Sequence, residues 1–327
     1  MTHRTQLTRQ IVTAAAMTLA ALGACFPGPP PSTGPAPAGR VTQHVVIVSI
    51  DGLRPDAIER FGATTIQRLM REGAYTLDAR TILPAKTLPS HTSMLTGVPP
   101  SVHGVDWNTD RTGEARDEHG EVPTPDSLAV PTVFELAHDA GFVTAAFFSK
   151  AKFHHLQTPG SLDYTQAPRL TLVPWGAERT VGDAAAYVRR YRPNLVFVHI
   201  GEPDYAGHAV GYMSWVYGEN VRIADRALER LVQAADDAYG AGDYTLIVTA
   251  DHGGHGHGHG EDVPTDVTIP WIAYGEGVRA GTVLGPGVST MDTAATALWL
   301  LGVPVPEWWE GEPVERAFVE GGAGRGE

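Results

Sequence analysis

The stretch that decides the fold is HVVIVSIDG, residues 44–52. Positions 45 to 48 and position 50 are β-branched apolar residues, and the run ends at Asp51-Gly52. Runs that are apolar at successive positions are typical of strands buried on both faces, as in parallel sheets. The stretch therefore predicts a buried strand of a parallel sheet, with a carboxylate at its carboxyl end.

Outside this strand, predicted strands alternate with predicted helices. Similar buried runs occupy residues 143–148, 195–200 and 244–249. Helices are expected at residues 56–72, 131–140, 180–191 and 219–238. This alternation predicts an α/β fold, with a mostly parallel central sheet, helices on both faces and one domain over residues 41–320.

Acidic residues follow three of the predicted strands. They are Asp51, Asp204 and the Asp251-His252 pair. One acid at a strand end is usually a turn or helix cap, but the carboxyl ends of parallel strands share one edge, where ligands bind. Three acids that converge there with histidines predict a metal site.

Histidines accompany two of these acids. Asp204 and His208 are four residues apart, so they share a face if the segment is helical, and Asp251 opens the tract DHGGHGHGHGED. Carboxylate with imidazole is a ligand set that zinc accepts. Because Cys25 is the one cysteine, a structural zinc site made of thiolates is excluded. Taken alone, Asp204 and His208 could be a solvated helix start, and the histidine tract could be a metal-scavenging loop. Taken together with Asp51, they predict a two-metal centre.

A candidate nucleophile lies in the segment KTLPSHTSMLTG, which begins at residue 86. Thr87 precedes a helix expected at about residues 90–95, and free N–H groups at a helix start favour anions such as an alkoxide or a phosphate oxygen. A bound metal would further lower the pKa of the hydroxyl. Spacing alone does not separate Thr87 from Ser90, Thr92 or Ser93.

The amino-terminal segment predicts export. Two arginines precede an uncharged run at 11–24, which is too short to span a bilayer as a helix and is typical of a secretory signal. The run ends LGAC, which resembles the bacterial lipobox and implies cleavage before Cys25 and lipid attachment to its sulfur; an ordinary signal peptide is the alternative. Residues 1–24 are thus a predicted lipoprotein signal peptide. Residues 25–40, rich in Pro and Gly, are a predicted tether to a bacterial membrane, outside the cytoplasm.

Composition narrows the possible functions. The chain carries 37 Asp+Glu against 24 Lys+Arg, and an acidic domain repels phosphate backbones, so bulk nucleic-acid binding is not expected. Hydrophobic residues make up 43% of the chain, enough for a sizeable core, which excludes wholesale disorder.

Four motifs in order resemble the alkaline phosphatase superfamily, and within it the type I phosphodiesterase/nucleotide pyrophosphatase branch. They are IVSIDGLRPD, LPAKTLPSHTSMLTGVPPSVHGVDWN, GEPDYAGH and TADHGGHGHGHGEDVPTDVTIPWIAYG. The likeness runs from residue 44 to about 303. The sulfatase branch uses a modified Cys or Ser in a C/S-x-P-x-R context, which this sequence lacks.

The resemblance implies roles for individual residues. The nucleophile of the branch matches Thr87, and its phosphoryl-binding Asn matches Asn108. Two divalent ions, most often zinc, are implied. One would be held by Asp51, Thr87, Asp251 and His252, and the other by Asp204, His208 and His259. His255 and His257 remain alternatives to His259, because a Gly-alternating tract can slip in register.

Two lysines bear on the substrate. Lys150 and Lys152 follow a predicted strand and are either a solvated loop or cations that reach the phosphoryl group or a substrate carboxylate. The pair resembles the Lys-x-Lys of phosphonoacetate hydrolases and, more loosely, the Lys-x-Arg of Thr-dependent phosphomonoesterases.

The sequence thus predicts a metal-dependent phosphohydrolase that forms a phosphothreonine intermediate. Phosphodiesters and nucleotides are its expected substrates. The alternatives are an enzyme acting on monoesters or phosphonates through Lys150 and Lys152 and, more remotely, a non-catalytic zinc-binding lipoprotein.

Overall fold

The computed structural model describes residues 39–109, 128–158, 160–168 and 176–319. The predicted signal peptide, Cys25 and nearly all of the predicted tether lie outside these residues. No helix among the described residues is both long and apolar enough to cross a membrane.

One sheet of eight strands forms the centre of the domain, in the order β4-β3-β5-β1-β6-β7-β2-β8. The strands are β1 (Val45–Ile50), β2 (Ala74–Arg80), β3 (Thr144–Phe147), β4 (Tyr164–Gln166), β5 (Leu195–Ile200), β6 (Thr245–Thr249), β7 (Thr268–Gly275) and β8 (Thr282–Val283). Only β7 runs against its neighbours, because it pairs antiparallel with both β6 and β2. The sheet is therefore mostly parallel, as predicted.

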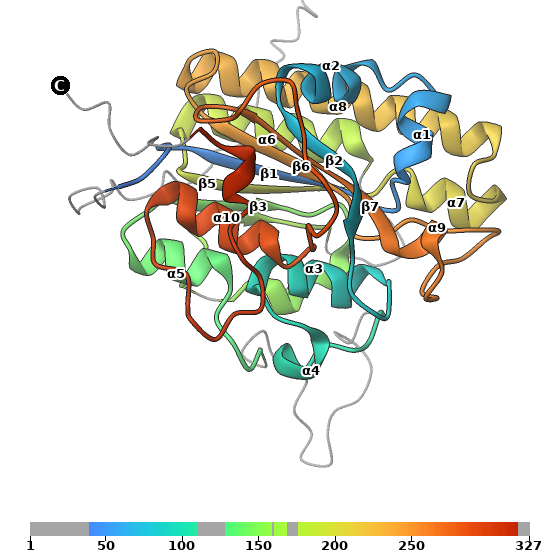
Figure 1. Cartoon of the computed structure of the whole chain (residues 1–327), viewed down its shortest axis with the longest axis horizontal. Helices are drawn as coiled ribbons and strands as arrows, with labels where there is room; N and C mark the ends of the chain where they lie inside the picture. Colours follow the sequence, from blue (N-terminus) through green and yellow to red (C-terminus); the bar gives the residue numbers. More distant parts are fainter. Residues whose placement is uncertain (1–38, 110–127, 159, 169–175, 320–327) are drawn as a thin grey trace, which may run out of the picture.

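Helices cover both faces of the sheet. In Figure 1, α2, α6 and α8 lie on one face, and α3, α5 and α10 lie on the other. The helices are α1 (Pro55–Arg60), α2 (Thr64–Glu72), α3 (Thr87–Thr96), α4 (Pro100–His103), α5 (Val133–Asp139), α6 (Ala177–Tyr191), α7 (Asp204–Val210), α8 (Trp215–Tyr239), α9 (Pro264–Val267) and α10 (Asp292–Leu301). The described residues also form the 3-10 helices η2 (Ala151–Leu156) and η3 (Glu315–Ala317).

Two predicted helices differ from the observed ones. The stretch predicted as one helix at 56–72 is two, α1 and α2, because Gly62 between them has a left-handed backbone (φ 67°) that no helix interior contains. Helix α3 begins at Thr87 and not near residue 90. The candidate nucleophile is therefore the first residue of the helix.

The predicted strand of residues 45–50 lies at the middle of the sheet. Its neighbours are β5 and β6, both parallel to it, and all six of its residues are buried. In the register, Ser49 pairs with His199 and with Thr249, so the three strands end level with one another. The residues that follow these ends must therefore meet at one edge.

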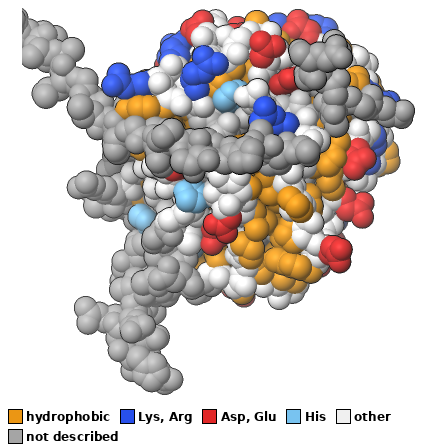
Figure 2. All heavy atoms as spheres, turned by 90° about the vertical axis from the view of Figure 1, so that its left-hand side faces the viewer, with side chains coloured by type: hydrophobic (Ala, Val, Ile, Leu, Met, Phe, Trp, Pro, Cys, Tyr) orange, Lys and Arg blue, Asp and Glu red, His pale blue; other side chains and the backbone are white. Residues whose placement is uncertain are grey.

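The amino ends of the strands form the opposite edge of the domain. The described chain begins at residue 39, shortly before the amino end of β1, which lies on this side of the domain (Figure 1). Figure 2 shows this side, where acidic and basic side chains are interspersed with hydrophobic ones. The predicted tether would therefore join the domain at the edge remote from the three acids.

Candidate metal and catalytic site

The three predicted acids meet at the carboxyl ends of β1, β5 and β6. Asp51, Asp204 and Asp251 are all buried. Two groups of side chains around them could each hold a metal ion, with ligand atoms within 4.8 Å of one another. One group is Asp51, Asp251 and His252, and the other contains Asp204, His252 and His259.

The first group presents free lone pairs to a common point. His252 Nε2 lies 3.5 Å from Asp51 Oδ1 and 3.2 Å from Asp251 Oδ2, and neither oxygen has a hydrogen-bond partner among the described residues. His252 Nδ1 donates to the carbonyl of Gly253 (2.8 Å), so in the neutral ring Nε2 is unprotonated. Burial lowers the pKa of His252 to about 3, which keeps the ring neutral. A cation is the group that would satisfy all three atoms.

His208, whose side chain is half exposed, lies beside Asp204 and His259 and extends the second group. His208 Nε2 lies 3.1 Å from His259 Nε2 and 3.3 Å from Asp204 Oδ1. The distance from His259 Nε2 to Asp204 Oδ1 is 3.7 Å. The Nδ1 atoms donate to backbone carbonyls, that of His208 to His257 (2.9 Å) and that of His259 to Ala85 (2.8 Å). The neutral rings therefore direct two lone pairs at each other beside a carboxylate. This arrangement is typical of metal-binding imidazoles, whose other nitrogen is held by a hydrogen bond.

The alternatives to His259 lie elsewhere. His255 Nδ1 is 2.7 Å from Asp266 Oδ1, and His257 Nδ1 is 3.2 Å from the carbonyl of His208. Of the three histidines that the tract left open, the structure brings His259 to Asp204 and His208.

Lys150 lies between the two groups. Its Nζ atom is 2.5 Å from Asp51 Oδ2 and 2.7 Å from Asp204 Oδ2. Burial opposes ionisation of Asp51, but the Lys150 charge, the hydrogen bond to His199 and the nearby imidazoles together outweigh it and lower the pKa of this carboxyl. Burial and the charge of Asp51 raise the pKa of Asp251. The cluster thus holds more negative charge than Lys150 alone balances.

The structure distinguishes Thr87 from the other hydroxyls of its helix. Thr87 Oγ1 is buried, 3.5 Å from His252 Nε2. The other hydroxyls bond away from the cluster: Ser90 to Thr81, Thr92 to the carbonyl of Leu88 and to His155, and Ser93 to His103. Thr87 is therefore the hydroxyl placed at the first metal group, at the start of α3.

Asn108 and Lys152 lie together beside this helix start. Asn108 Oδ1 accepts hydrogen bonds from the Leu88 backbone N–H (3.0 Å) and from Lys152 Nζ (2.9 Å). The amide nitrogen of Asn108 is then the group left to donate to a substrate oxygen. Burial and the nearby Lys150 charge lower the pKa of Lys152 to about 8. Of the predicted site residues, Cys25 lies outside the described residues, and all the others meet at this edge.

Two buried histidines escaped the sequence reasoning. His199 Nε2 lies 2.9 Å from Asp51 Oδ2, and its Nδ1 lies 2.7 Å from Ser149 Oγ. His91 Nδ1 donates to the carbonyl of Thr87 (2.8 Å). Both lie inside segments that the sequence marked, one on a predicted strand and one in the KTLPSH segment. A polar residue on a wholly buried strand was the available signal for His199.

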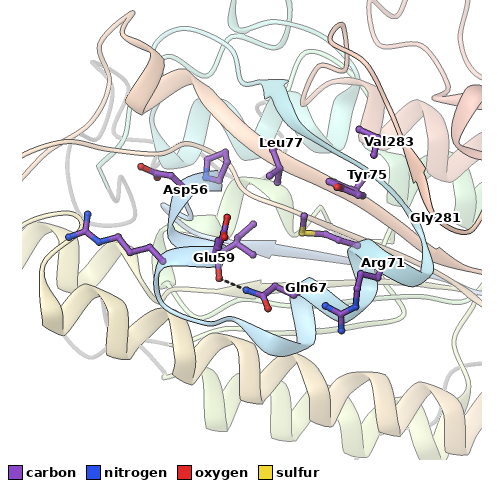
Figure 3. A pocket seen from close by; sticks show the side chains of 12 residues that line it. Asp56, Glu59, Gln67, Arg71, Tyr75, Leu77, Gly281 and Val283 are labelled. Atoms are coloured by element: carbon purple, nitrogen blue, oxygen red, sulfur yellow. Dashed lines mark hydrogen bonds between the residues drawn. The ribbon is translucent and has the colours of Figure 1, made fainter.

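A cavity of about 1140 Å³ lies outside this cluster, between α1, α2, β2 and β8 (Figure 3). Its lining mixes charged side chains such as Asp56, Glu59 and Arg71 with apolar ones such as Leu77 and Val283. None of the predicted site residues lines it. The cavity is therefore separate from the cluster at the strand ends.

Comparison with known proteins gives a consistent result. A family model described as type I phosphodiesterase / nucleotide pyrophosphatase matches residues 45–259. The bis(5'-adenosyl)-triphosphatase enpp4 of Xenopus laevis is 26% identical over 236 residues, which are 67% of this chain and 49% of that protein. The GPI ethanolamine phosphate transferase 1 of Candida glabrata is 31% identical over 151 residues, 40% of this chain and 16% of that protein. The matches thus span half or less of these relatives' own length.

Among solved structures, the murine ectonucleotide pyrophosphatase / phosphodiesterase 5 in complex with AMP has a similar fold. The TM-score is 0.71 at 17% identity, covering 85% of this chain and 100% of that one. At this identity the likeness is one of fold, and it confirms the predicted alkaline-phosphatase-like α/β class.

Proposed function

Because this chain belongs to the type I phosphodiesterase / nucleotide pyrophosphatase family, we propose that it is a metal-dependent phosphohydrolase with Thr87 as its nucleophile. One observation carries the proposal: Asp51 Oδ1 and Asp251 Oδ2 are buried without a hydrogen-bond partner among the described residues. Both face His252, which lies 3.5 Å from the Thr87 hydroxyl. A hydroxyl, a neutral imidazole and two carboxylates around one point are a site for a cation and a nucleophile together.

Two zinc ions fit the donor atoms. Only oxygen and nitrogen atoms are offered, by four residues at the first site and three at the second, which suits zinc and also tolerates manganese or iron. The first ion would be held by Asp51, Thr87, Asp251 and His252. The second would be held by Asp204, His208 and His259. Such a pair supplies Lewis acidity to the attacking and leaving oxygens of an in-line displacement.

The residues of the chain define the rest of the reaction. Thr87 Oγ1 attacks phosphorus, so that the Oγ1–P bond forms while the bond from phosphorus to the leaving oxygen breaks. The hydroxyl proton of Thr87 passes through solvent to the leaving oxygen. The product of this step is phosphothreonine. Water then attacks phosphorus and the Oγ1–P bond breaks; one proton of the water goes to Thr87 Oγ1, and the remaining hydroxyl of the water stays on phosphorus. At the start of α3, the backbone N–H of Thr87 would donate to the developing negative charge. The other first-turn positions offer no further donor, because the Leu88 N–H bonds to Asn108, position 89 is proline, and the Ser90 N–H bonds to the carbonyl of Lys86.

Asn108 should contribute as a donor to a non-bridging phosphoryl oxygen. We expect Asn108→Ala to reduce turnover by about 10²–10³, as loss of one such donor does in other enzymes. The reduction should appear mainly in kcat, because the bond strengthens as charge develops in the transition state. Steady-state kinetics on a nitrophenyl diester, with zinc content measured in the same samples, checks this. Unchanged kcat at full zinc content would contradict the role.

Lys152 gives a specific reason to keep a second candidate, hydrolysis of monoesters or phosphonates. A monoester carries one more negative charge than a diester, and the Lys152 ammonium lies on Asn108, where that charge would bind. Lys150 is committed to Asp51 and Asp204. Lys152 is therefore the lysine better placed to select between the substrates.

The substrate preference is tested by profiling one diester, one monoester and phosphonoacetate side by side. Lys152→Gln should reduce monoester turnover by roughly 10–100-fold, the value of a hydrogen bond to a charged group, and diester turnover less. Because the pKa of Lys152 is lowered to about 8, the wild-type preference for monoesters should fall as pH rises through that value. Lys152→Arg is the control, since its charge persists at higher pH. Equal losses on all substrates would remove Lys152 from substrate selection.

The relatives' names suggest small nucleotide or phosphoester substrates, and we include these in the proposal. One relative is a bis(5'-adenosyl)-triphosphatase, and one similar structure contains AMP. The acidic composition disfavours bulk nucleic acid.

For location, we propose that the protein is exported and lipid-anchored through Cys25 to a bacterial membrane. The described chain enters at the amino end of β1, and the six residues of this strand rise about 20 Å before reaching Asp51. The anchor would therefore join the domain opposite the metal groups, so that substrates in solution can reach them.

The location is tested with Cys25→Ser. We expect the wild-type protein in the membrane fraction, because two acyl chains give stable anchoring, and the variant either released or unprocessed. The activity of the folded domain should be the same in both. If the wild-type protein is soluble and its mature amino terminus is another residue, the segment is an ordinary secretory signal and Cys25 carries no anchor.

A further inference from the structure

Tyr212 has a contact that the proposed reaction does not use. It lies between α7 and α8, almost fully buried, and its hydroxyl donates to Asp204 Oδ1 at 2.6 Å. This is the oxygen that faces His208 Nε2 and His259 Nε2, whereas the other oxygen, Oδ2, faces Lys150. Burial and the Asp204 charge raise the pKa of Tyr212, so the phenol stays a donor.

The ring of Tyr212 occupies a slot formed by three glycines. A Cβ atom would come within 3.1 Å of the Tyr212 hydroxyl at Gly52, within 2.6 Å of the ring at Gly207 and within 2.3 Å of it at Gly254. Distances under 3.0 Å are not tolerated between a Cβ and a ring, so Gly207 and Gly254 must be glycine while the ring is there. At Gly52 the backbone adds its own requirement, with φ at 71°.

These three glycines come from three different metal motifs. Gly52 follows Asp51, Gly207 precedes His208, and Gly254 lies in the tract that opens with Asp251 and His252. The backbone N–H of Tyr212 also donates to the carbonyl of Gly256, farther along that tract (2.8 Å). One side chain thus touches every segment that contributes a ligand from a strand end.

We propose that Tyr212 is a positioning residue for the second metal group: its hydroxyl orients the Asp204 carboxylate, and its ring sets the spacing of the three glycine segments. The inference rests on the proposed function, since it concerns how the metal ligands are held. Hydrogen bonds to ligating carboxylates fix their orientation and charge, and removing such a partner typically costs about 10–100-fold in metal affinity.

The neighbouring Tyr217 has a structural role and serves as a comparison for Tyr212. Its hydroxyl donates to the carbonyl of Gly52 (2.8 Å) and accepts from the backbone N–H of Arg54 (3.2 Å). Both partners are backbone groups. Tyr212 is the tyrosine whose hydroxyl reaches a predicted ligand.

The test is zinc affinity of the full chain, measured by stripping the metal and titrating zinc against a chelator of known affinity. Tyr212→Phe keeps the ring in the slot and removes the hydroxyl. We expect one of the two binding steps to weaken by about 10–100-fold and the other to stay unchanged. Thermal unfolding of the metal-free variant should match that of the metal-free wild type, because the ring contacts remain.

Tyr239→Phe is the matched control. Tyr239 is also buried, and its hydroxyl donates to the carbonyl of Pro193, away from the metal groups. The zinc affinity of the Tyr239→Phe variant should equal that of the wild-type protein. Tyr212→Phe with both binding steps at wild-type affinity would overturn the proposal, and a wild-type protein that binds no zinc would overturn the proposed function with it.

The slot is tested separately by a pair of glycine substitutions in helices. Gly207→Ala places a methyl group against the Tyr212 ring, whereas Gly182→Ala, in α6, meets nothing within 4 Å. We expect Gly207→Ala to weaken one zinc-binding step by at least the factor seen for Tyr212→Phe, and Gly182→Ala to leave zinc binding unchanged. If both variants bind zinc like the wild type, the ring does not set the spacing of the segments.

Discussion

Thr87→Ala should reduce phosphodiester turnover by roughly 10⁴ or more, because removing a nucleophile costs far more than removing a donor. Thr87 Oγ1 is buried at the first residue of α3 and lies 3.5 Å from His252 Nε2. No other hydroxyl of the helix points to the cluster: those of Ser90, Thr92 and Ser93 bond elsewhere. Turnover of a nitrophenyl diester by zinc-loaded wild type and variant measures the loss.

Thr96→Ala is the matched control for this prediction. Thr96 is a buried threonine of the same helix, and its hydroxyl donates to the carbonyl of Thr92 (2.7 Å), away from the metal groups. It should lose some stability and keep its kcat. Circular dichroism and zinc content should be the same for Thr87→Ala and the wild type.

An acid quench during turnover adds a direct readout. Mass spectrometry of the peptide that contains Thr87 should find a phosphate on this residue in the wild type. Near-wild-type turnover by Thr87→Ala would assign the attack to another group. A zinc-loaded wild type without any turnover would favour the non-catalytic zinc-binding protein.

The centre of the fold was predictable because it depends on local pattern. The run at residues 45–50 is apolar at nearly every position, so it could only be a strand with both faces buried. Parallel neighbours then end at one edge, which brings Asp51, Asp204 and Asp251 together whatever the details of the loops. The acids of the site were therefore predictable from the same pattern as the sheet.

The other edge of the sheet was not predictable in this way. Strand β2 mixes polar and apolar residues, with a register irregularity between Thr76 and Ala79, and β8 has only two residues. Strand β7 contains Pro270 and still pairs on both sides. Pairing with distant segments stabilises these strands, and no local pattern encodes that pairing.

Contacts between side chains far apart in sequence were equally hidden. His199 reaches Asp51 across 148 positions, and Lys150 reaches it across 99. The sequence left Lys150 open between a solvated loop and a substrate-binding cation, and its ammonium contacts the carboxylates of Asp51 and Asp204. The partners of a lysine in a loop depend on how the strands are arranged, which the local sequence does not give.

The choice of His259 among the tract's histidines depends on Asp266. This buried carboxylate accepts from the backbone N–H groups of Gly260 (2.9 Å) and Glu261 (3.1 Å), and it also holds the ring of His255. The loop is thereby fixed with His255 outward and His259 inward. The sequence contains Asp266 but gives no sign that it pairs with the tract, so the register stayed open.

Removing the metal should abolish turnover, and restoring two zinc ions per chain should recover it. Without cations, Asp51, Asp204 and Asp251 are buried together, and among the described residues Lys150 is the cation in contact with them. Thr87 then lacks the group that would activate its hydroxyl. Dialysis against a chelator, followed by metal analysis and a zinc titration of activity, measures this. Full activity with one ion or none would contradict the two-metal proposal.

The histidine tract supplies a matched pair for the same experiment. His259→Ala should lose one of the two ions and most of the activity. Removing a hydrogen-bond partner of a ligand already lowers metal affinity by roughly 10–100-fold, and removing the ligand itself should lower it further. His257→Ala should keep both ions, because its ring bonds to the carbonyl of His208 and belongs to neither metal group of the described residues. If His257→Ala loses an ion and His259→Ala does not, the register of the tract is different in the loaded protein.

Zinc affinity should also increase with pH, because zinc must displace a proton from Asp251. Burial and the charge of Asp51 raise the pKa of this carboxyl, so it keeps a proton in the metal-free protein to a higher pH than an ordinary carboxyl. Only the ionised oxygen binds a cation, so the proton must leave as zinc enters. Below that raised pKa, each unit of pH should strengthen the first ion's binding by up to about tenfold. Calorimetry of zinc binding in buffers of different ionisation enthalpy should detect the released proton. Zinc binding that neither releases a proton nor changes with pH would place Asp251 outside the ligand set.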